Sequence, residues 1–249
     1  MKTVLITGCS SGFGLETARY FLERDWKVIA TMRTPREGLL PSSDNLRILP
    51  LDVTNAQSIE NVVKEAGEID VLVNNAGIGI LSALEGTSMD VVFDIFNTNT
   101  FGTIALTRAF IPQFTQRKSG VVINVTSTVT LKSLPLLSVY AASKAAVNAF
   151  TESLALELAP FNVRVNLVLP GMAPQTAFGE NAQSRMQDVF PGDYAEYAQN
   201  IFASMLKTEI ITHAVDVAEA IWRAANDDSA PMRIPAGADA VALAALVSA

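Results

Sequence analysis

The chain has 249 residues, of which 49% are hydrophobic and 17% are charged, and its net charge at pH 7 is -7. This length allows one large domain or two small ones around a substantial core. The acidic balance excludes the basic footprint of a nucleic-acid-binding protein and disfavours an anionic membrane as a partner. No apolar run is long enough to span a bilayer, and the single cysteine, Cys9, cannot form an intrachain disulfide. We therefore expect a soluble, cytoplasmic protein.

Short β-branched apolar runs alternate with longer helical patterns along the first two thirds of the chain. Continuous apolar runs are typical of strands buried on both faces of a parallel sheet. The pattern predicts an α/β fold, a doubly wound Rossmann-type sheet of about seven strands with helices on both faces, in one domain over residues 1–249. The predicted strands are 3–7, 27–31, 46–50, 70–74, 121–125 and 163–168, and the predicted helices are about 12–24, 55–66, 88–117 and 140–160.

The regular alternation of strand and helix patterns ends after Pro170. Residues 171–193 are rich in Gly, Pro, Gln, Met and Phe, and a loop of this length in a compact domain is usually functional. We expect a substrate lid over about 172–210. Helical patterns return at 194–206 and 214–226, a last strand is expected at 232–236, and the apolar end is interpreted as a packed tail or a subunit contact.

A glycine loop follows the first predicted strand. In TGCSSGFG, Gly8, Gly12 and Gly14 lie between that strand and a helical pattern, which is the context of a dinucleotide-binding turn. The alternative is an ordinary tight turn. The second strand ends without an acidic residue, and Arg33 follows it, so a guanidinium is placed where NADP carries its 2′-phosphate. A solvated loop arginine is the other interpretation.

The stretch YAASK places Tyr140 and Lys144 on one helical face. A tyrosine is a poor base, because its reference pKa is about 10. A lysine charge about 5 Å away, at an effective dielectric of about 20, would lower that pKa by about two. Ser127, just past the fifth predicted strand, can hydrogen-bond a substrate oxygen. Each residue alone also fits a structural role, and only the combination behind a nucleotide loop favours catalysis.

These motifs resemble the short-chain dehydrogenase/reductase family, in its single-domain branch, and are closest to its 17-beta-hydroxysteroid and retinol dehydrogenase-like members. The matching segments are TGCSSGFG, LDVT, NNAG, NTFG, YAASK and LPG, in the family's order, with Ser127 thirteen positions before Tyr140. The resemblance implies that Tyr140 is the general acid/base, that Lys144 holds the nicotinamide ribose, and that Ser127 binds the substrate oxygen. It also implies that Asn99 holds a water of a proton relay.

The resemblance further implies an extended cofactor site, and Arg33 favours NADP(H) over NAD(H) as the cofactor. Thr176 stands six positions after Pro170 rather than the family's usual five, so an extra residue, for example Pro174, is expected to reshape this loop. Besides Tyr140 and Lys144, the implied cofactor contacts are Gly8, Ser10, Ser11, Gly12, Phe13, Gly14, Arg33, Asp52, Val53, Asn75, Ala76, Gly77, Pro170, Gly171 and Thr176.

The expected function is reversible reduction of a hydrophobic ketone to a secondary alcohol, because the lid is rich in apolar residues. The residues expected to line the substrate pocket are Leu134, Leu137, Met172 and Phe178. Two alternatives stay open: a 3-oxoacyl-carrier-protein reductase, and a non-catalytic NADP-sensing regulatory protein. No metal site is expected, since His213 has no cluster of ligands around it and Cys9 fits a packing role. Relatives lead us to expect a homodimer or homotetramer.

Overall fold

The structure is a computed structural model that describes residues 1–176, 182, 190–192, 194–205 and 210–248. Within them, seven strands form one sheet in the order β3-β2-β1-β4-β5-β6-β7, and every neighbouring pair is parallel. This confirms the predicted doubly wound sheet. The strands are β1 Thr3–Ile6, β2 Lys27–Met32, β3 Leu46–Pro50, β4 Val71–Asn74, β5 Gly120–Val125, β6 Val163–Pro170 and β7 Arg233–Ala236.

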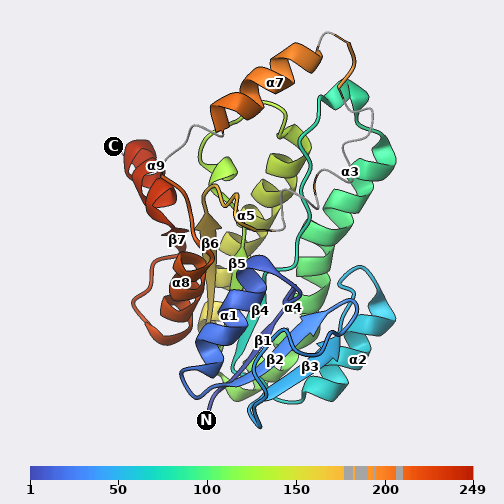
Figure 1. The fold of residues 1–249 in the computed structure, drawn as a ribbon. Helices are drawn as coiled ribbons and strands as arrows, with labels where there is room; N and C mark the ends of the chain where they lie inside the picture. Colours follow the sequence, from blue (N-terminus) through green and yellow to red (C-terminus); the bar gives the residue numbers. More distant parts are fainter. Residues whose placement is uncertain (177–181, 183–189, 193, 206–209, 249) are drawn as a thin grey trace.

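Helices cover both faces of the sheet (Figure 1). The helices α1 Gly12–Leu22 and α8 Ala214–Asn226 pack together on one face, and α2 Ala56–Ala66, α4 Gly102–Arg117 and α5 Ser138–Leu158 cover the other. In β1, Val4 and Ile6 belong to the core under α1 and α8, whereas Leu5 belongs to the core on the opposite face. Because successive side chains point to opposite faces and both are buried, the strands have continuous apolar sequences.

The predicted helix over 88–117 is wrong as one element. It consists of α3 Met89–Phe96, a π-helical turn Asn97–Phe101 and α4. The apolar pattern continues on both sides of the turn, so a 3.6-residue period does not reveal the inserted residue. Single π-turns inside helices are frequent at functional sites, and this one carries Asn99.

The last elements lie around the carboxyl-terminal part of the sheet. Helix α7 Tyr194–Met205 lies at the end of the molecule opposite to the N-terminus (Figure 1). The apolar tail forms a further helix, α9 Ala238–Ser248, which packs against β7. Its side chains Val241, Leu246 and Val247 are exposed. Within the described ranges, no helix combines the length and the apolar character needed to cross a bilayer.

A buried series of side-chain hydrogen bonds fixes α5 on the sheet. Asn74 Nδ2 of β4 donates to Asn124 Oδ1 of β5 at 2.8 Å, and Asn124 Nδ2 donates to Thr151 Oγ1 of α5 at 2.8 Å. All three residues are nearly inaccessible to solvent. Directional bonds of this kind specify one orientation of a helix that apolar packing alone leaves adjustable. These hydrogen bonds therefore orient the helix that carries Tyr140 and Lys144.

Candidate active site

The glycine loop forms the start of α1 and fits a phosphate group. Gly8 and Gly12 have positive φ angles of 75° and 56°. A β-carbon on Gly14 would overlap the Gly8 carbonyl oxygen, so glycine is required there. The first turn of α1 has no acidic residue, and its N-cap, Ser11, makes no side-chain cap bond. The amide groups at this helix start are therefore available to an anion. The other predicted loop residues, Ser10 and Phe13, are partly buried beside them.

The end of β4 is joined to this loop through Thr7. Thr7 Oγ1 accepts hydrogen bonds from the Asn75 amide at 2.9 Å and from the Ala76 amide at 2.8 Å. Asn75 Nδ2 donates to the Thr7 carbonyl at 2.8 Å. The strand order reverses between β1 and β4, and such a switch point is where doubly wound sheets bind ligands. The structure thus brings the predicted glycine and Asn75–Gly77 segments together.

The remaining predicted cofactor residues lie along the same edge. Arg33 follows β2 and is exposed. The Asp52 carboxylate accepts from Thr54, from the amide at 2.9 Å and from the hydroxyl at 2.7 Å. Val53 packs so closely against Gly102 that a β-carbon there would lie 2.8 Å from Val53 Cγ2.

Thr176 reaches the glycine loop despite the extra residue before it. A β-carbon on Gly12 would lie 3.5 Å from Thr176 Cβ. The Thr176 hydroxyl donates to the Ala173 carbonyl at 2.9 Å, which closes a tight turn at this point. That turn contains Pro174, and the expected contact of Thr176 with the cofactor stays a prediction.

Tyr140 and Ser127 meet in a buried position. Tyr140 is 7% exposed and Ser127 is 8% exposed. Burial raises the pKa of the Tyr140 phenol above its ordinary value, and a hydrogen bond with the Ser127 side chain offsets part of that rise. Ser127 Oγ also accepts the Val129 amide at 3.3 Å, which orients the hydroxyl.

Lys144 lies one helical turn further along α5 and is also buried. Its Nζ donates to the Val125 carbonyl at 3.0 Å. A β-carbon on Gly77 would lie 3.3 Å from Lys144 Nζ and 3.2 Å from Asn99 Oδ1, so the three residues converge. Burial lowers the pKa of Lys144 to about 8.

The pKa direction of Tyr140 differs from the sequence-based expectation. We expected the lysine charge to lower the pKa of Tyr140, yet burial is the largest cause at both groups and acts in opposite directions on them. Desolvation disfavours the phenolate and the ammonium alike. In the protein alone, Tyr140 is therefore held as the neutral acid, whereas Lys144, with a pKa of about 8, stays mostly charged at pH 7.

Asn99 uses its side chain to hold the π-turn in place. Its Oδ1 accepts the Ile78 amide at 2.8 Å, and its Nδ2 donates to the Ile78 carbonyl at 2.9 Å and to Ser143 Oγ at 3.0 Å. Ser143 Oγ donates in turn to the Tyr140 carbonyl at 2.7 Å. Asn99 is thereby linked to the start of α5. Both hydrogens of its Nδ2 are used, and its Oδ1 can accept one further hydrogen bond.

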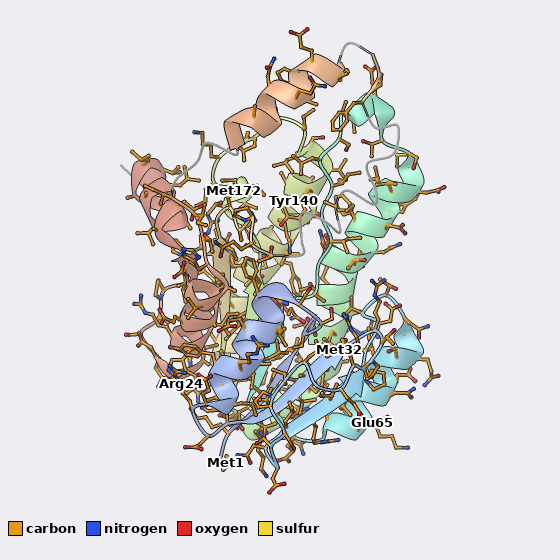
Figure 2. All side chains as sticks on the ribbon, viewed as in Figure 1. Met1, Arg24, Met32, Glu65, Tyr140 and Met172 are labelled. Carbon is orange, nitrogen blue, oxygen red and sulfur yellow. The ribbon has the colours of Figure 1, made fainter. Side chains whose placement is uncertain are left out.

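The predicted substrate-lining residues are placed around the start of α5 and the end of β6. Leu137 is buried and precedes α5, Leu134 is 38% exposed, and Met172 is partly buried after β6. Figure 2 labels Tyr140 and Met172, and both lie in the half of the molecule away from Met1. Phe178 lies outside the described residues.

The loop after β6 is pinned by two residues that sequence reasoning missed. Asp239, in the first turn of α9, accepts the Met172 amide at 2.7 Å and the Thr212 hydroxyl at 2.6 Å. The Thr212 amide donates to the Met172 carbonyl at 2.8 Å, and the Gly171 amide donates to Thr212 Oγ1 at 2.9 Å. A β-carbon on Gly171 would overlap the Asp239 carboxylate. The backbone at Gly171 and Met172 is therefore fixed from outside the loop.

Cys9 and His213, which were predicted to have no catalytic or metal-binding role, are found in the following surroundings. Cys9 is fully buried, and burial raises the pKa of its thiol to about 12, so it stays protonated. His213 precedes α8, and its amide donates to the Asp216 carboxylate at 2.8 Å. In the part of the chain that the structure describes, no group of three His, Cys, Asp or Glu side chains is arranged to hold a metal ion.

The comparisons agree with this geometry. Residues 2–187 match the family described as short chain dehydrogenase. The chain is 34% identical to retinol dehydrogenase 8 of Bos taurus over 93% of its own length and 80% of that protein. It is 38% identical to 3-ketodihydrosphingosine reductase of Bacteroides thetaiotaomicron over 82% of its length and 74% of that protein. The chain belongs to the short-chain dehydrogenase/reductase family of oxidoreductases.

Solved structures support the same assignment. A short-chain dehydrogenase from Streptomyces avermitilis has a TM-score of 0.84 and 33% identity, with 100% of this chain and 94% of that chain covered. A serine dehydrogenase complexed with NADP+ has a TM-score of 0.78 and 29% identity, covering 94% and 93%. A 3-ketoacyl-(acyl-carrier-protein) reductase from Brucella melitensis complexed with NADH has a TM-score of 0.77 and 25% identity, covering 94% and 96%.

Proposed function

We propose that this chain is an NADP(H)-dependent carbonyl reductase that interconverts a hydrophobic ketone and its secondary alcohol. The observation that carries the proposal is the buried meeting of Tyr140 with Ser127, one helical turn from Lys144 and at the sheet edge that holds the glycine loop. The glycine loop, Arg33 and Thr176 fit a dinucleotide, since the loop leaves the start of α1 open to an anion.

The cofactor, when bound, supplies the hydride, and the protein supplies the proton and the orientation of the substrate. Ser127 donates a hydrogen bond to the substrate oxygen and steadies the charge that develops there. Tyr140, held neutral by burial, donates the proton to that oxygen in the reductive direction. Lys144 is placed to bind ribose hydroxyls and to return a proton toward the phenol, with Asn99 beside it at Gly77.

Two observations favour NADP(H) over NAD(H). Arg33 is exposed directly after β2, where a guanidinium can pair with a 2′-phosphate. The serine dehydrogenase that resembles this chain was solved with NADP+, although the more distant 3-ketoacyl reductase was solved with NADH. A kinetic comparison of NADPH with NADH tests the choice, because a preference for NADH would contradict it.

A hydrophobic substrate is favoured by Leu137, a buried apolar residue directly before the helix of Tyr140, and by two relatives. The relatives are named for retinol and for 3-ketodihydrosphingosine, both largely apolar molecules. A 3-oxoacyl-carrier-protein reductase is the second candidate, favoured by the similarity to the Brucella melitensis enzyme. A non-catalytic NADP sensor is disfavoured because both Tyr140 and Lys144 are retained.

The test is a panel of ketones, aldehydes and acyl thioesters, with NADPH oxidation followed by its absorbance. We expect turnover of apolar ketones, and loss of that turnover in Tyr140→Phe with cofactor binding retained. Faster reduction of acyl thioesters would favour the second candidate. No turnover of any compound would refute the enzyme and revive the sensor.

We also propose that the protein is a cytoplasmic homo-oligomer. Apolar side chains on the outer side of α3, the π-turn and α5 are exposed: Met89 is 59% exposed, Phe93 56%, Phe101 57% and Leu156 79%. Exposed large apolar side chains on elements that contact one another favour a contact with a second copy. Light scattering after size-exclusion chromatography measures the oligomeric state, and a monomer at micromolar concentration would contradict the proposed oligomer.

A further inference from the structure

Asn148 lies one helical turn beyond Lys144 on α5, on the face that also carries Tyr140. Its side chain is buried, with 6% exposed. Asn148 Nδ2 donates to Thr130 Oγ1 at 2.9 Å, and Thr130 Oγ1 donates to the Ser127 carbonyl oxygen at 2.8 Å. Two consecutive hydrogen bonds therefore run from the helix of Tyr140 to the residue whose hydroxyl meets Tyr140.

The short turn after β5 decides where the Ser127 hydroxyl lies. The Thr130 amide donates to the Ser127 carbonyl at 3.2 Å, and the Val129 amide donates to Ser127 Oγ. Ser127 and Tyr140 come from different elements, the end of β5 and α5. The separation of the Ser127 and Tyr140 side chains therefore depends on the position of the turn Thr128–Thr130 relative to α5. The two hydrogen bonds through Thr130 Oγ1, here called the bridge, link this turn to α5.

The hydrogen bond from Asn148 Nδ2 to Thr130 Oγ1 is the one that the described residues show for this side chain. Its Oδ1 is buried and has no hydrogen-bond partner among them. Within the described residues, the polar side chain of Asn148 is therefore directed to the turn that carries Ser127.

We propose that Asn148 is a positioning residue for the catalytic pair, acting through Thr130 on the Ser127 turn. The inference rests on the proposed function, because it assigns Ser127 and Tyr140 to the chemistry. It predicts that loss of the bridge lowers the rate of the chemical step and leaves cofactor binding unchanged.

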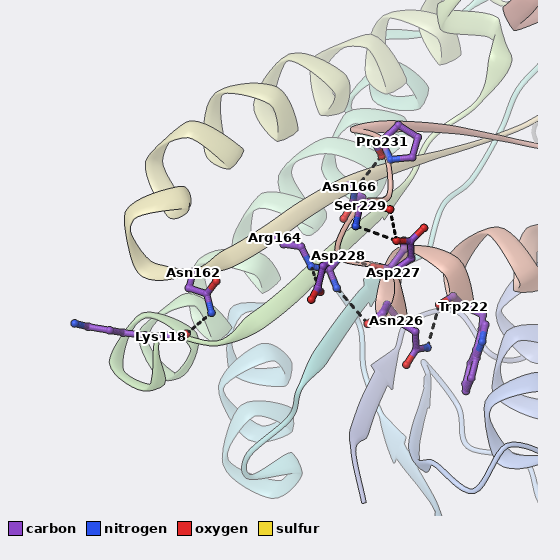
Figure 3. Close-up of polar contacts among 12 residues, drawn as sticks. Lys118, Asn162, Arg164, Asn166, Trp222, Asn226, Asp227, Asp228, Ser229 and Pro231 are labelled. Atoms are coloured by element: carbon purple, nitrogen blue, oxygen red, sulfur yellow. Dashed lines mark hydrogen bonds and ion pairs between the residues drawn. The ribbon is translucent and has the colours of Figure 1, made fainter.

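Asn166 offers a matched control. It is also buried, with 4% exposed, and its Nδ2 makes one hydrogen bond, to the Pro231 carbonyl at 3.0 Å (Figure 3). Its Oδ1 likewise has no partner among the described residues. Asn166 lies in β6 and binds the segment that precedes β7, so Asn166→Leu repeats the chemistry of Asn148→Leu without touching the Ser127 turn.

The first experiment measures kcat and both KM values on a ketone that the wild type reduces. Asn148→Leu and Thr130→Val should each lower kcat by about 10- to 100-fold, the typical effect of a misplaced catalytic group, with the KM for NADPH unchanged. Thr130→Ser, which keeps the hydroxyl, should recover most of the kcat lost in Thr130→Val. The double variant should be no slower than the slower single variant, since both break one bridge.

The comparison with Asn166→Leu separates positioning from general stability. That variant should keep kcat within about twofold of the wild type, although its unfolding midpoint in urea moves as far as that of Asn148→Leu. Equal kcat values in the two leucine variants would overturn the proposal, and so would additive losses in the double variant.

The second experiment does not depend on activity. Hydrogen exchange at the Val129 and Thr130 amides should be several-fold faster in Asn148→Leu than in Asn166→Leu, because only the former frees the turn. A wild type that reduces nothing on the panel would refute the proposed function, whereas this exchange would still report on the bridge. Unchanged exchange would overturn the bridge whatever the enzyme does.

Discussion

Replacing Lys144 with methionine should stabilise the cofactor-free protein at neutral pH, although it removes a residue that the proposed reaction requires. Burial lowers the lysine pKa from 10.5 to about 8. At pH 7 the lysine is charged in both the folded and the unfolded protein, and burying this charge lowers the free energy of unfolding by about 3 kcal/mol. Methionine has a similar length and no charge. Loss of the bond to the Val125 carbonyl removes about 1 kcal/mol at every pH, so the net gain is about 2 kcal/mol.

The pH dependence gives the sharper test. Between pH 8 and pH 10.5 the unfolded chain binds the lysine proton more tightly than the folded protein does, so wild-type stability rises with pH through this window. The advantage of Lys144→Met should therefore shrink by about 2 kcal/mol between pH 7 and about pH 9.5. Tyr140 contributes with the opposite sign above its ordinary pKa, since its folded pKa is raised, and it cancels because both proteins carry it.

Urea unfolding at several pH values, followed by the fluorescence of Trp26 and Trp222, measures this difference without added cofactor. Lys64→Met is the control, because Lys64 is exposed on α2 and its charge stays in water. A constant difference between wild type and Lys144→Met over the whole range would refute the assignment of a buried, strongly desolvated lysine.

Three further predictions concern other parts of the molecule. Arg33→Ala should raise the KM for NADPH by about 10- to 100-fold and leave that for NADH unchanged, as loss of a charged hydrogen bond to phosphate implies; equal effects would contradict the assignment. Gly102→Ala should cost about 1–3 kcal/mol in urea unfolding, because its β-carbon would press on Val53. Asp239→Ala should weaken turnover more than Asp227→Ala, since Asp239 holds the Met172 amide whereas Asp227 holds the turn at Ser229; similar activities of the two variants would argue against this role.

The strands could be predicted from the sequence because each is buried on both faces and leaves a continuous apolar run. The segments that meet at the carboxyl edge were also predictable, because the order of motifs places them there. Asn148 was readable in principle, since it continues the four-residue spacing of Tyr140 and Lys144. It was missed because a polar residue in a helix has many possible roles.

Other features depend on distant contacts that local patterns do not contain. The bond from Met172 to Asp239 joins residues 67 positions apart, and that from Gly171 to Thr212 joins residues 41 apart. The π-turn requires the bonds between Asn99 and Ile78, 21 positions away. The predicted pKa direction of Tyr140 is wrong because spacing reveals a neighbouring charge, whereas burial is a property of the whole fold.

The bonds at Asp239 have a consequence for how much variation this chain tolerates between Met172 and Thr212. The chain leaves the sheet after Pro170, and Met172 and Thr212 are bonded to each other and to the same carboxylate. A segment whose ends are fixed together can be lengthened, shortened or exchanged at little cost to the rest of the fold. Changes of length or sequence between these two residues should therefore leave Ser127, Tyr140 and Lys144 in their positions.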